Sequence, residues 1–316
     1  MDNYTKYSFI IPDNMLGQRV DKALAQLCSD FSRSTVQSWI KQGLVVLDDE
    51  QPRQKDKVLG GELVDISVPE IRQGEWESQD LPLDIVYQDE YMLVINKPAG
   101  LVVHPGAGNP DQTLLNALLF HLPENRSLAR AGIVHRLDKD TSGLMVVART
   151  EGARLGLIDQ LVDHSLHREY LALVIGSVIS GNIVDEPIAR DKADRRKMAV
   201  NMLGKDAITH YRVDQRFRNH TLLRVRLETG RTHQIRVHMA HIGFPLVGDP
   251  VYGRRLAIPG DCAPALEQQL RSFKRQALHA TRIEYRHPVS GEIQSWSRPL
   301  PEDMQQLVDA CENDNH

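Results

Sequence analysis

The spacing of apolar residues changes near residue 70, and this change constrains the fold more than any other feature of the sequence. Between Leu16 and Ile40 apolar residues recur every three or four positions, which predicts two short helices. Two later runs, 44–47 and 63–68, are rich in β-branched residues and predict strands. The residues from 71 to about 80 lose this periodicity and gain charge and glycine, as linkers do. We therefore expect a small ααββ domain over residues 1–75, followed by a linker.

Short apolar runs separated by turn signals dominate the sequence after Leu81. The runs DIVY, MLVIN, LMVVA, YLALVIG and LLRVRLE predict strands. Helical spacing is confined to a few stretches, 113–122, 153–164 and 233–242, the last of which we expect Thr232 to cap. The predicted fold class is α+β, with a central mixed, largely antiparallel sheet flanked by helices and loops. This larger domain is expected over residues 81–306, before a polar tail over 307–316.

Composition limits the class of protein. The formal net charge of −4 and the pI of about 6.4 argue against a protein that coats nucleic acid nonspecifically, since that mode needs positive charge over the whole surface. Cys28, Cys262 and Cys311 lie far apart and suit neither a disulfide framework nor a zinc ribbon. No run of eighteen apolar residues occurs, and the first residues have no long apolar stretch after a basic head, so we expect no secretory leader. We expect a soluble, cytoplasmic protein.

Positive charge is nevertheless concentrated locally. Residues 186–240 hold thirteen Lys and Arg against six Asp and Glu, an excess of seven, with Arg195, Arg196 and Lys197 at its densest point. This segment is predicted to face phosphates. In the small domain Arg19, Arg33 and Lys41 could also contact phosphates, but residues 1–70 carry eight Lys and Arg against eleven Asp and Glu. A solvated surface explains those three residues equally well.

One carboxylate, Asp138, lies in the run HRLDKDTSG between two apolar, strand-like segments. Loops that a rigid scaffold holds between two strands often carry functional residues, although the local residue types also suit an ordinary turn. A zinc site was considered at His233, His238 and His241, but their spacing places them on different helix faces, and no metal is expected. The glycines of HPGAGNP are not followed by a phosphate-binding pattern and predict a tight loop.

Four separated segments resemble the RluA-type family of pseudouridine synthases, in that family's order: NKPAGLVVHPGAGNP (96–110), AGIVHRLDKDTSGLMVVART (131–150), REYLALVIG (168–176) and LETGRTHQIRVHMAHIGFPLVGDPVYG (227–253). The small domain resembles the RNA-binding domain named after a small-subunit ribosomal protein. The resemblance implies an isomerase, an intramolecular transferase that converts uridine to pseudouridine without cofactor or metal. It also implies large-subunit (23S) ribosomal RNA, free or in an assembling large subunit, as substrate, a role in ribosome biogenesis, and a monomeric enzyme.

The same resemblance assigns roles to individual residues. It implies that Asp138 is the catalytic carboxylate, that Arg236 pairs with it, and that Tyr170 packs on the target uracil. Leu246 would line the same pocket, and Arg136 would fill the space that the flipped nucleotide leaves in the RNA. His135 and Thr141 would shape the catalytic loop or contact phosphate. Attack on the anomeric carbon and removal of the 2′ proton are both open to a carboxylate at the position of Asp138.

Other functions fit parts of the sequence. A glycoside hydrolase or nucleosidase could use Asp138, but the motifs offer no second acid. A synthase of the same family could act on other rRNA or tRNA uridines. A non-catalytic ribosome-assembly factor could keep the scaffold alone, although the intact Asp138, Tyr170 and Arg236 speak against loss of function.

Overall fold

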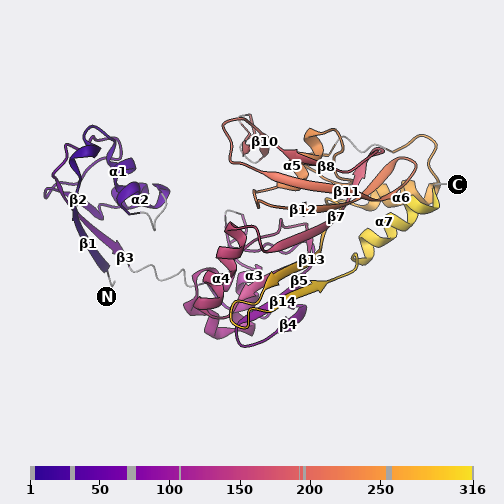
Figure 1. The fold of residues 1–316 in the computed structure, drawn as a ribbon, viewed down its shortest axis with the longest axis horizontal. Coiled ribbons are helices and arrows are strands. Elements are labelled where there is room, and N and C mark those ends of the chain that lie inside the picture. The colour runs from indigo at the N-terminus through magenta and orange to yellow at the C-terminus, as the bar shows by residue number, and fades with distance from the viewer. Residues whose placement is uncertain are drawn as a thin grey trace. The chain divides into compact units, whose positions relative to one another are not determined.

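The computed structural model describes residues 4–28, 33–69, 76–106, 108–191, 193–194, 197–253 and 258–314. The chain divides into two compact units, Met1–Glu75 and Trp76–His316 (Figure 1).

The small unit begins with a strand that the sequence analysis missed. It contains β1 (Tyr4–Ile10), a 3-10 turn (Asp13–Met15), α1 (Val20–Leu27), α2 (Arg33–Lys41), β2 (Val45–Leu47) and β3 (Leu63–Pro69). The antiparallel sheet has the order β1-β3-β2, with β1 paired to β3 along seven residues. The predicted ααββ order is therefore incomplete. Polar residues such as Thr5, Lys6 and Ser8 interrupt β1 and hide its strand pattern, and its partner lies more than fifty residues away.

The periodic residues of the small unit form its core, as predicted. Val20, Leu24, Val36, Trp39 and Ile40 are buried in one cluster with residues of the sheet. Burying this apolar surface, at about 25 cal/mol per Å², is the main force that holds two such short helices in place.

The large unit is built on one extended sheet. Its strands are β4 (Ile85–Gln88), β5 (Met92–Lys97), β6 (Ser142–Ala148), β7 (His167–Ile175), β8 (Asn182–Asp185), β11 (Ile208–Arg216), β12 (His220–Leu227), β13 (Leu278–Arg286) and β14 (Ile293–Ser297). Among the described residues the order is β4-β5-β6-β13-β7-β12-β11-β8, with β14 also paired to β13. Only β6 and β13 run parallel in this part of the chain. The predicted mixed, largely antiparallel sheet is confirmed. A separate hairpin joins β9 (Ile188–Arg190) to β10 (Met198–Val200).

Helices pack around this sheet (Figure 1). They are α3 (Leu114–His121), α4 (Glu151–Val162), α5 (Gln234–His241), α6 (Pro264–Ser272) and α7 (Glu302–Asn313), with 3-10 turns at Pro123–Ser127 and Ala129–Gly132. The three predicted helices are confirmed within two residues at each end. The expected cap at Thr232 is wrong, because His233 is the residue before α5 and adopts a left-handed conformation with φ 57°.

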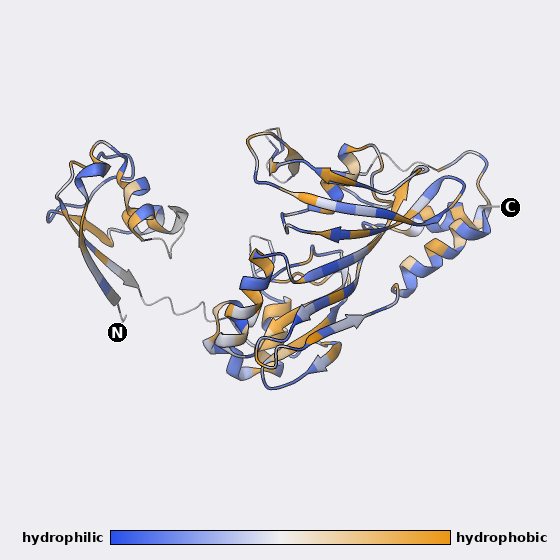
Figure 2. Ribbon diagram, in the orientation of Figure 1, coloured by the Kyte–Doolittle hydropathy of each residue, from blue (hydrophilic) through white to orange (hydrophobic). Residues whose placement is uncertain are grey.

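Two predicted boundaries of the large unit are also wrong. The expected polar tail is most of α7, whose Leu307, Val308 and Cys311 are buried against α6. Apolar residues at helical spacing among charged ones give α7 one buried face, and Figure 2 shows this mixture along the helix. The expected linker up to about residue 80 is partly folded: Asn116 donates to the Glu77 carbonyl, and Trp76 packs edge-on against His104.

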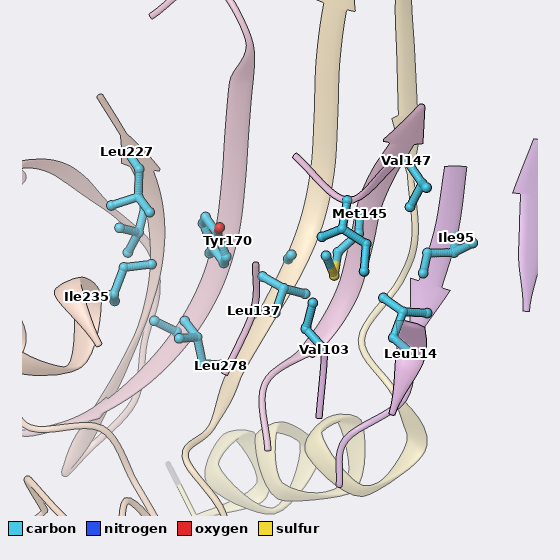
Figure 3. Packing of buried hydrophobic residues seen from close by; sticks show 14 of the residues in the cluster. Ile95, Val103, Leu114, Leu137, Met145, Val147, Tyr170, Leu227, Ile235 and Leu278 are labelled. Atoms are coloured by element: carbon cyan, nitrogen blue, oxygen red, sulfur yellow. The ribbon is translucent and has the colours of Figure 1, made fainter. Parts of the chain in front are cut away.

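The two faces of β7 bury different side chains. Tyr170 and Ala172 belong to the main core cluster, whereas Leu171 and Leu173 pack with α6 and α7. Figure 3 shows Tyr170 in the main cluster, with Leu227 and Ile235 on one side and Leu137 on the other. Alternate residues of a strand point to opposite faces, so Arg168 shares the face of Tyr170.

Candidate active site

A cleft of about 700 Å³ opens on the Tyr170 face of the sheet in the large unit. Strand β7 contributes Arg168 and Tyr170 to it. Three loops complete it among the described residues: 102–109 after β5, 130–141 before β6, and 227–236 between β12 and α5. These loops come from three of the four segments that carry the family resemblance, so the fold brings distant motifs together.

Hydrogen bonds from Lys97 hold the loop that carries Asp138 in place. The Lys97 ammonium is fully buried and donates to the carbonyls of Pro98, Leu101 and Lys139 at 2.7–2.9 Å. Three donors on one ammonium group match these three carbonyl acceptors. Burial lowers the pKa of Lys97 to about 7. The Thr141 N–H donates to the Asp138 carbonyl, which closes the turn around the carboxylate.

Asp138 itself lies at the cleft with 15% of its side chain exposed. Arg236 on α5 donates from Nη1 to Asp138 Oδ2 at 3.0 Å. The other oxygen, Oδ1, is 3.9 Å from His233 Nε2, beyond hydrogen-bond distance. One carboxylate oxygen is thus held by a cation, and the other is available to a ligand.

Arg236 is oriented by a second carboxylate that the sequence analysis missed. Asp249 accepts from Arg236 Nε at 2.7 Å and Nη2 at 2.9 Å, and from the Val251 and Tyr252 N–H groups. Burial alone would raise the pKa of Asp249, but the hydrogen bonds and charge of Arg236 hold it below its ordinary value. Burial by itself would lower the pKa of Arg236, but the two carboxylates outweigh burial and raise this pKa above its ordinary value. The three charged groups carry a net charge of −1.

His233 and Tyr252 border the same carboxylates. The Tyr252 hydroxyl accepts from the Met198 N–H and hydrogen-bonds His233 Nδ1, both at 2.8 Å. Its ring lies under the Arg236 guanidinium, 5.0 Å from centroid to Cζ, a cation–π distance. Burial lowers the pKa of His233. The left-handed backbone of His233 is the type of strained conformation that clusters at functional sites.

Tyr170 forms part of the cleft wall, with only 4% of its surface exposed. Burial raises the pKa of its hydroxyl. The ring sits among Leu227, Ile235 and Leu278, which also line the cleft (Figure 3). This wall offers a flat aromatic surface to a planar ligand.

The cleft gathers most of the predicted substrate-binding residues but leaves one out. Arg136 is exposed at its edge, and Thr141 is buried, with its hydroxyl accepting from Gln276. His135 lines the cleft and accepts from the Val146 N–H through Nε2. Leu246 is wrong as a pocket residue: it is fully buried in the core, bridges to Val174, and does not line the cleft. Because Leu246 is apolar and pairs with Val174 of β7, it packs in the main core cluster.

The predicted RNA-contacting residues whose side chains the structure describes do not line this cleft. Arg19 binds the buried carboxylate of Asp21 at 2.9 Å, so part of its charge is compensated, whereas Lys41 is exposed at the end of α2. Lys197 is half-buried, and its N–H donates to the Asp194 carbonyl. The side chain of Arg33, and all of Arg195 and Arg196, fall outside the described residues.

Arg224, which lies within the positively charged segment 186–240, does not present free charge. It pairs with Glu169 at 2.7 Å and with Asp214 at 2.9 Å. The sequence excess of seven therefore overstates the charge available to phosphates. Of the histidines considered for zinc, His238 is bound instead by Thr209 and the Glu186 carbonyl. Within the described ranges no cluster of three or more His, Cys, Asp or Glu suits a metal.

Comparison with known proteins decides the family. A family model described as RNA pseudouridylate synthase matches residues 91–241, which include Asp138, Tyr170 and Arg236. Over 306 residues the chain is 54% identical to ribosomal large subunit pseudouridine synthase D of Xanthomonas campestris pv. campestris, covering 97% of this chain and 92% of that protein. The chain belongs to the RNA pseudouridylate synthase family.

Other pseudouridine synthases agree with this assignment. The chain is 53% identical to the Pseudomonas aeruginosa protein of the same name over 304 residues, covering 96% of this chain and 95% of that one. The solved structure of human RNA pseudouridylate synthase domain containing 1 aligns with a TM-score of 0.53 and 25% identity, covering 74% of this chain and 96% of that one. The pseudouridine synthase fold expected from the sequence is therefore confirmed. No described helix of this synthase has the length and apolar character needed to cross a membrane.

Proposed function

We propose that the protein isomerises specific uridines of large-subunit (23S) ribosomal RNA to pseudouridine, with Asp138 as the catalytic carboxylate. The observation that carries this proposal is the pairing of Asp138 with Arg236 at 3.0 Å inside the cleft. Relatives that are more than half identical over nearly the whole chain are named ribosomal large subunit pseudouridine synthases. Their printed substrate, large-subunit ribosomal RNA, is the one we transfer to this protein.

The reaction makes particular demands on the site. The C1′–N1 bond of uridine breaks, the uracil turns in place, and a new bond joins C1′ to C5. C5 gives up its proton and N1 takes one up, so the product has the same atoms as the substrate. Positive charge develops at C1′ as the first bond breaks. The net charge of −1 on Asp138, Arg236 and Asp249 suits that charge. No described residue donates a hydrogen bond to Asp138 Oδ1, whose neighbour His233 Nε2 is 3.9 Å away. Asp138 either bonds to C1′ or removes the 2′ proton.

Two neighbouring residues would handle the base. Tyr170 provides the aromatic wall on which the flipped uracil stacks and turns. A uridine in folded RNA must leave its stack to reach the cleft, which costs a few kcal/mol. Arg136, which is exposed and lines the cleft, would fill the space left in the RNA.

The remaining features of the proposal concern the setting of the enzyme. Residues 1–75 would bind RNA beside the target, and residues 76–314 would carry the chemistry. The substrate would be rRNA or an assembling large subunit in the cytoplasm, the enzyme a monomer, and the chemistry free of metal and cofactor, since Asp138, Tyr170 and Arg236 supply the groups that the reaction needs.

Chemical mapping of pseudouridine in rRNA tests this function. Cells that lack the protein are compared with cells that express the wild type or Asp138→Ala. We expect particular 23S sites to lose pseudouridine and the wild type alone to restore them. Loss at tRNA sites only would redirect the substrate, and restoration by Asp138→Ala would remove the assigned carboxylate.

A further inference from the structure

Arg168 is a buried cation for which the described part of the chain provides no acceptor. It lies on β7 with 7% of its surface exposed, and it lines the cleft. Its Nε atom is buried, and among the described residues it has no hydrogen-bond partner and its guanidinium has no carboxylate partner. Tyr170 lies two residues further along the same face of β7, about 7 Å from Arg168 along the strand. The fold thus places an unsatisfied positive charge beside the aromatic wall.

A second unsatisfied donor, on His135, belongs to the same cleft as Arg168. His135 accepts from the Val146 N–H through Nε2, so the proton of the neutral ring is on Nδ1. Nδ1 is buried and has no hydrogen-bond partner in the ranges that the structure describes. After burial itself, the charge of Arg168 is the second cause that lowers the pKa of His135 to about 3. Both side chains line the same cleft, so one ligand bound there can meet both.

Such groups are rarely left unsatisfied in a folded protein. A buried polar group without a partner costs about 1–3 kcal/mol, and a buried unpaired charge costs more. The glycine at 230 keeps space for the guanidinium, because a Cβ there would lie 2.9 Å from Arg168 Nη1. A ligand that enters the cleft would satisfy both donors.

The charge of the cleft indicates the sign of that ligand. Arg130, Arg136 and Arg168 line it without a described carboxylate partner, and the only carboxylate among the lining residues, Asp138, is bound to Arg236. Guanidinium groups bind phosphate through two parallel hydrogen bonds. A neutral uracil offers no charge to match Arg168, whereas each RNA linkage carries one negative charge.

We propose that Arg168, with His135 Nδ1–H beside it, binds a backbone phosphate next to the uridine that stacks on Tyr170. This subsite rests on the proposed function and deepens it. It fixes the flipped nucleotide by its phosphate while its base lies against Tyr170, so that the ribose between them is presented to Asp138. Arg168 is thus a positioning residue that reads the backbone and not the base.

The test is a double-mutant cycle between protein and RNA. Binding is measured in the Asp138→Ala background with an rRNA fragment that the wild type modifies, and with two copies that carry a neutral methylphosphonate 5′ or 3′ of the target uridine. We expect Arg168→Gln and one of the two neutral linkages each to weaken binding about tenfold, and the combination to weaken it no further. Arg168→Gln should also lower the salt slope of log Kd by about one.

Two controls separate this subsite from a structural role. Arg271→Gln removes an exposed arginine of α6 that pairs with Glu267, and its losses should simply add to those of the neutral linkages. Arg168→Met removes a buried unpaired charge, so its melting temperature should equal or exceed that of the wild type. Additive losses for Arg168→Gln with both linkages would overturn the proposal, as would misfolding of both Arg168 variants.

The proposed function has its own readout in this experiment. Pseudouridine formation by the wild type on the unmodified fragment reports that function, and the binding cycle reports the subsite. Pseudouridine formed alongside additive binding losses would refute the phosphate subsite alone. No pseudouridine from any ribosomal fragment would refute the proposed function.

Discussion

Arg236 binds Asp249 through two nitrogens, Nε at 2.7 Å and Nη2 at 2.9 Å, so that its third nitrogen, Nη1, reaches Asp138. The carboxylate of Asp249 is fully buried and is itself held by two backbone N–H groups. A guanidinium is planar, so fixing two of its nitrogens fixes the direction of the third. Asp249 therefore sets the geometry in which Arg236 meets the proposed catalytic carboxylate.

Replacing Asp249 by Asn should damage both stability and turnover. The substitution leaves Arg236 as a buried cation with one carboxylate in place of two, and breaking a buried pair costs about 3–5 kcal/mol. We expect the free energy of unfolding in urea to fall by roughly that amount, and the single-turnover rate to fall by at least tenfold. Glu267→Gln, which breaks the exposed pair with Arg271, should cost less than about 1 kcal/mol. Equal losses in the two variants would contradict this role of Asp249.

The pH dependence of stability should reveal the burial of His135. Its pKa is about 3 in the folded protein, whereas an unfolded histidine titrates near 6.5. The unfolded chain therefore takes up a proton that the folded protein excludes, and stability falls as the pH drops from about 6.5 towards 3, by up to about 1.4 kcal/mol per pH unit. Urea unfolding at pH 7, 5.5 and 4.5 should show a shallower decline for His135→Gln, which keeps an acceptor for the Val146 N–H.

Other buried histidines, among them His279 with a pKa lowered to about 4, will keep part of the decline in that variant. Replacement of the exposed His167 by Gln serves as the control and should leave the wild-type profile unchanged. A wild-type decline in His135→Gln would mean that this ring is protonated in the folded protein.

The hydroxyl of Tyr170 should matter for turnover and not for folding. Within the described part of the chain it has no hydrogen-bond partner, and burial raises its pKa, so it stays protonated at neutral pH. We expect Tyr170→Phe to unfold at the wild-type urea concentration and to bind RNA normally, while single-turnover pseudouridine formation falls at least tenfold through loss of a contact with the substrate. An unchanged rate would limit Tyr170 to stacking, and a large loss of stability would reveal a missed partner.

Removal of residues 1–75 should leave a folded catalytic unit. The core clusters around the cleft draw their residues from Trp76 onwards. We expect the truncated protein to keep its melting temperature and a slow reaction on rRNA fragments, with weaker RNA binding. Calorimetry and filter binding measure the two effects. Failure of the truncated protein to fold would contradict the division at residue 75.

The sequence predicted the large sheet well where each strand is apolar and bounded by turns, as with β5, β6 and β7. It missed β13, although this strand lies between β6 and β7 at the centre of the sheet. β13 alternates charged residues such as Arg282 and Glu284 with buried ones, and its partners come from far earlier in the chain. Long-range pairing of this kind is invisible to local patterns.

The residues of the candidate site also fall into two groups, those that the sequence predicted and those that only the structure reveals. Asp138, Tyr170 and Arg236 came from motifs, and the structure brings them to one cleft. Asp249 and Arg168 stand in the same motifs but were passed over, because an acidic residue before proline suggests a turn and an arginine on a strand suggests solvent. Their burial distinguishes them from ordinary surface charges: Asp249 pairs with Arg236, and Arg168 has no partner among the described residues.

The most direct measurement of the central claim compares Asp138→Ala with Asp140→Ala, the neighbouring carboxylate of the same loop. Both proteins should fold, since Arg236 keeps its pair with Asp249 when Asp138 is removed. At saturating enzyme on an rRNA fragment that the wild type modifies, Asp138→Ala should form no pseudouridine while it binds the RNA within about threefold of wild type, a difference below 1 kcal/mol. Asp140→Ala should stay close to the wild-type rate. Pseudouridine formed by Asp138→Ala would contradict the account.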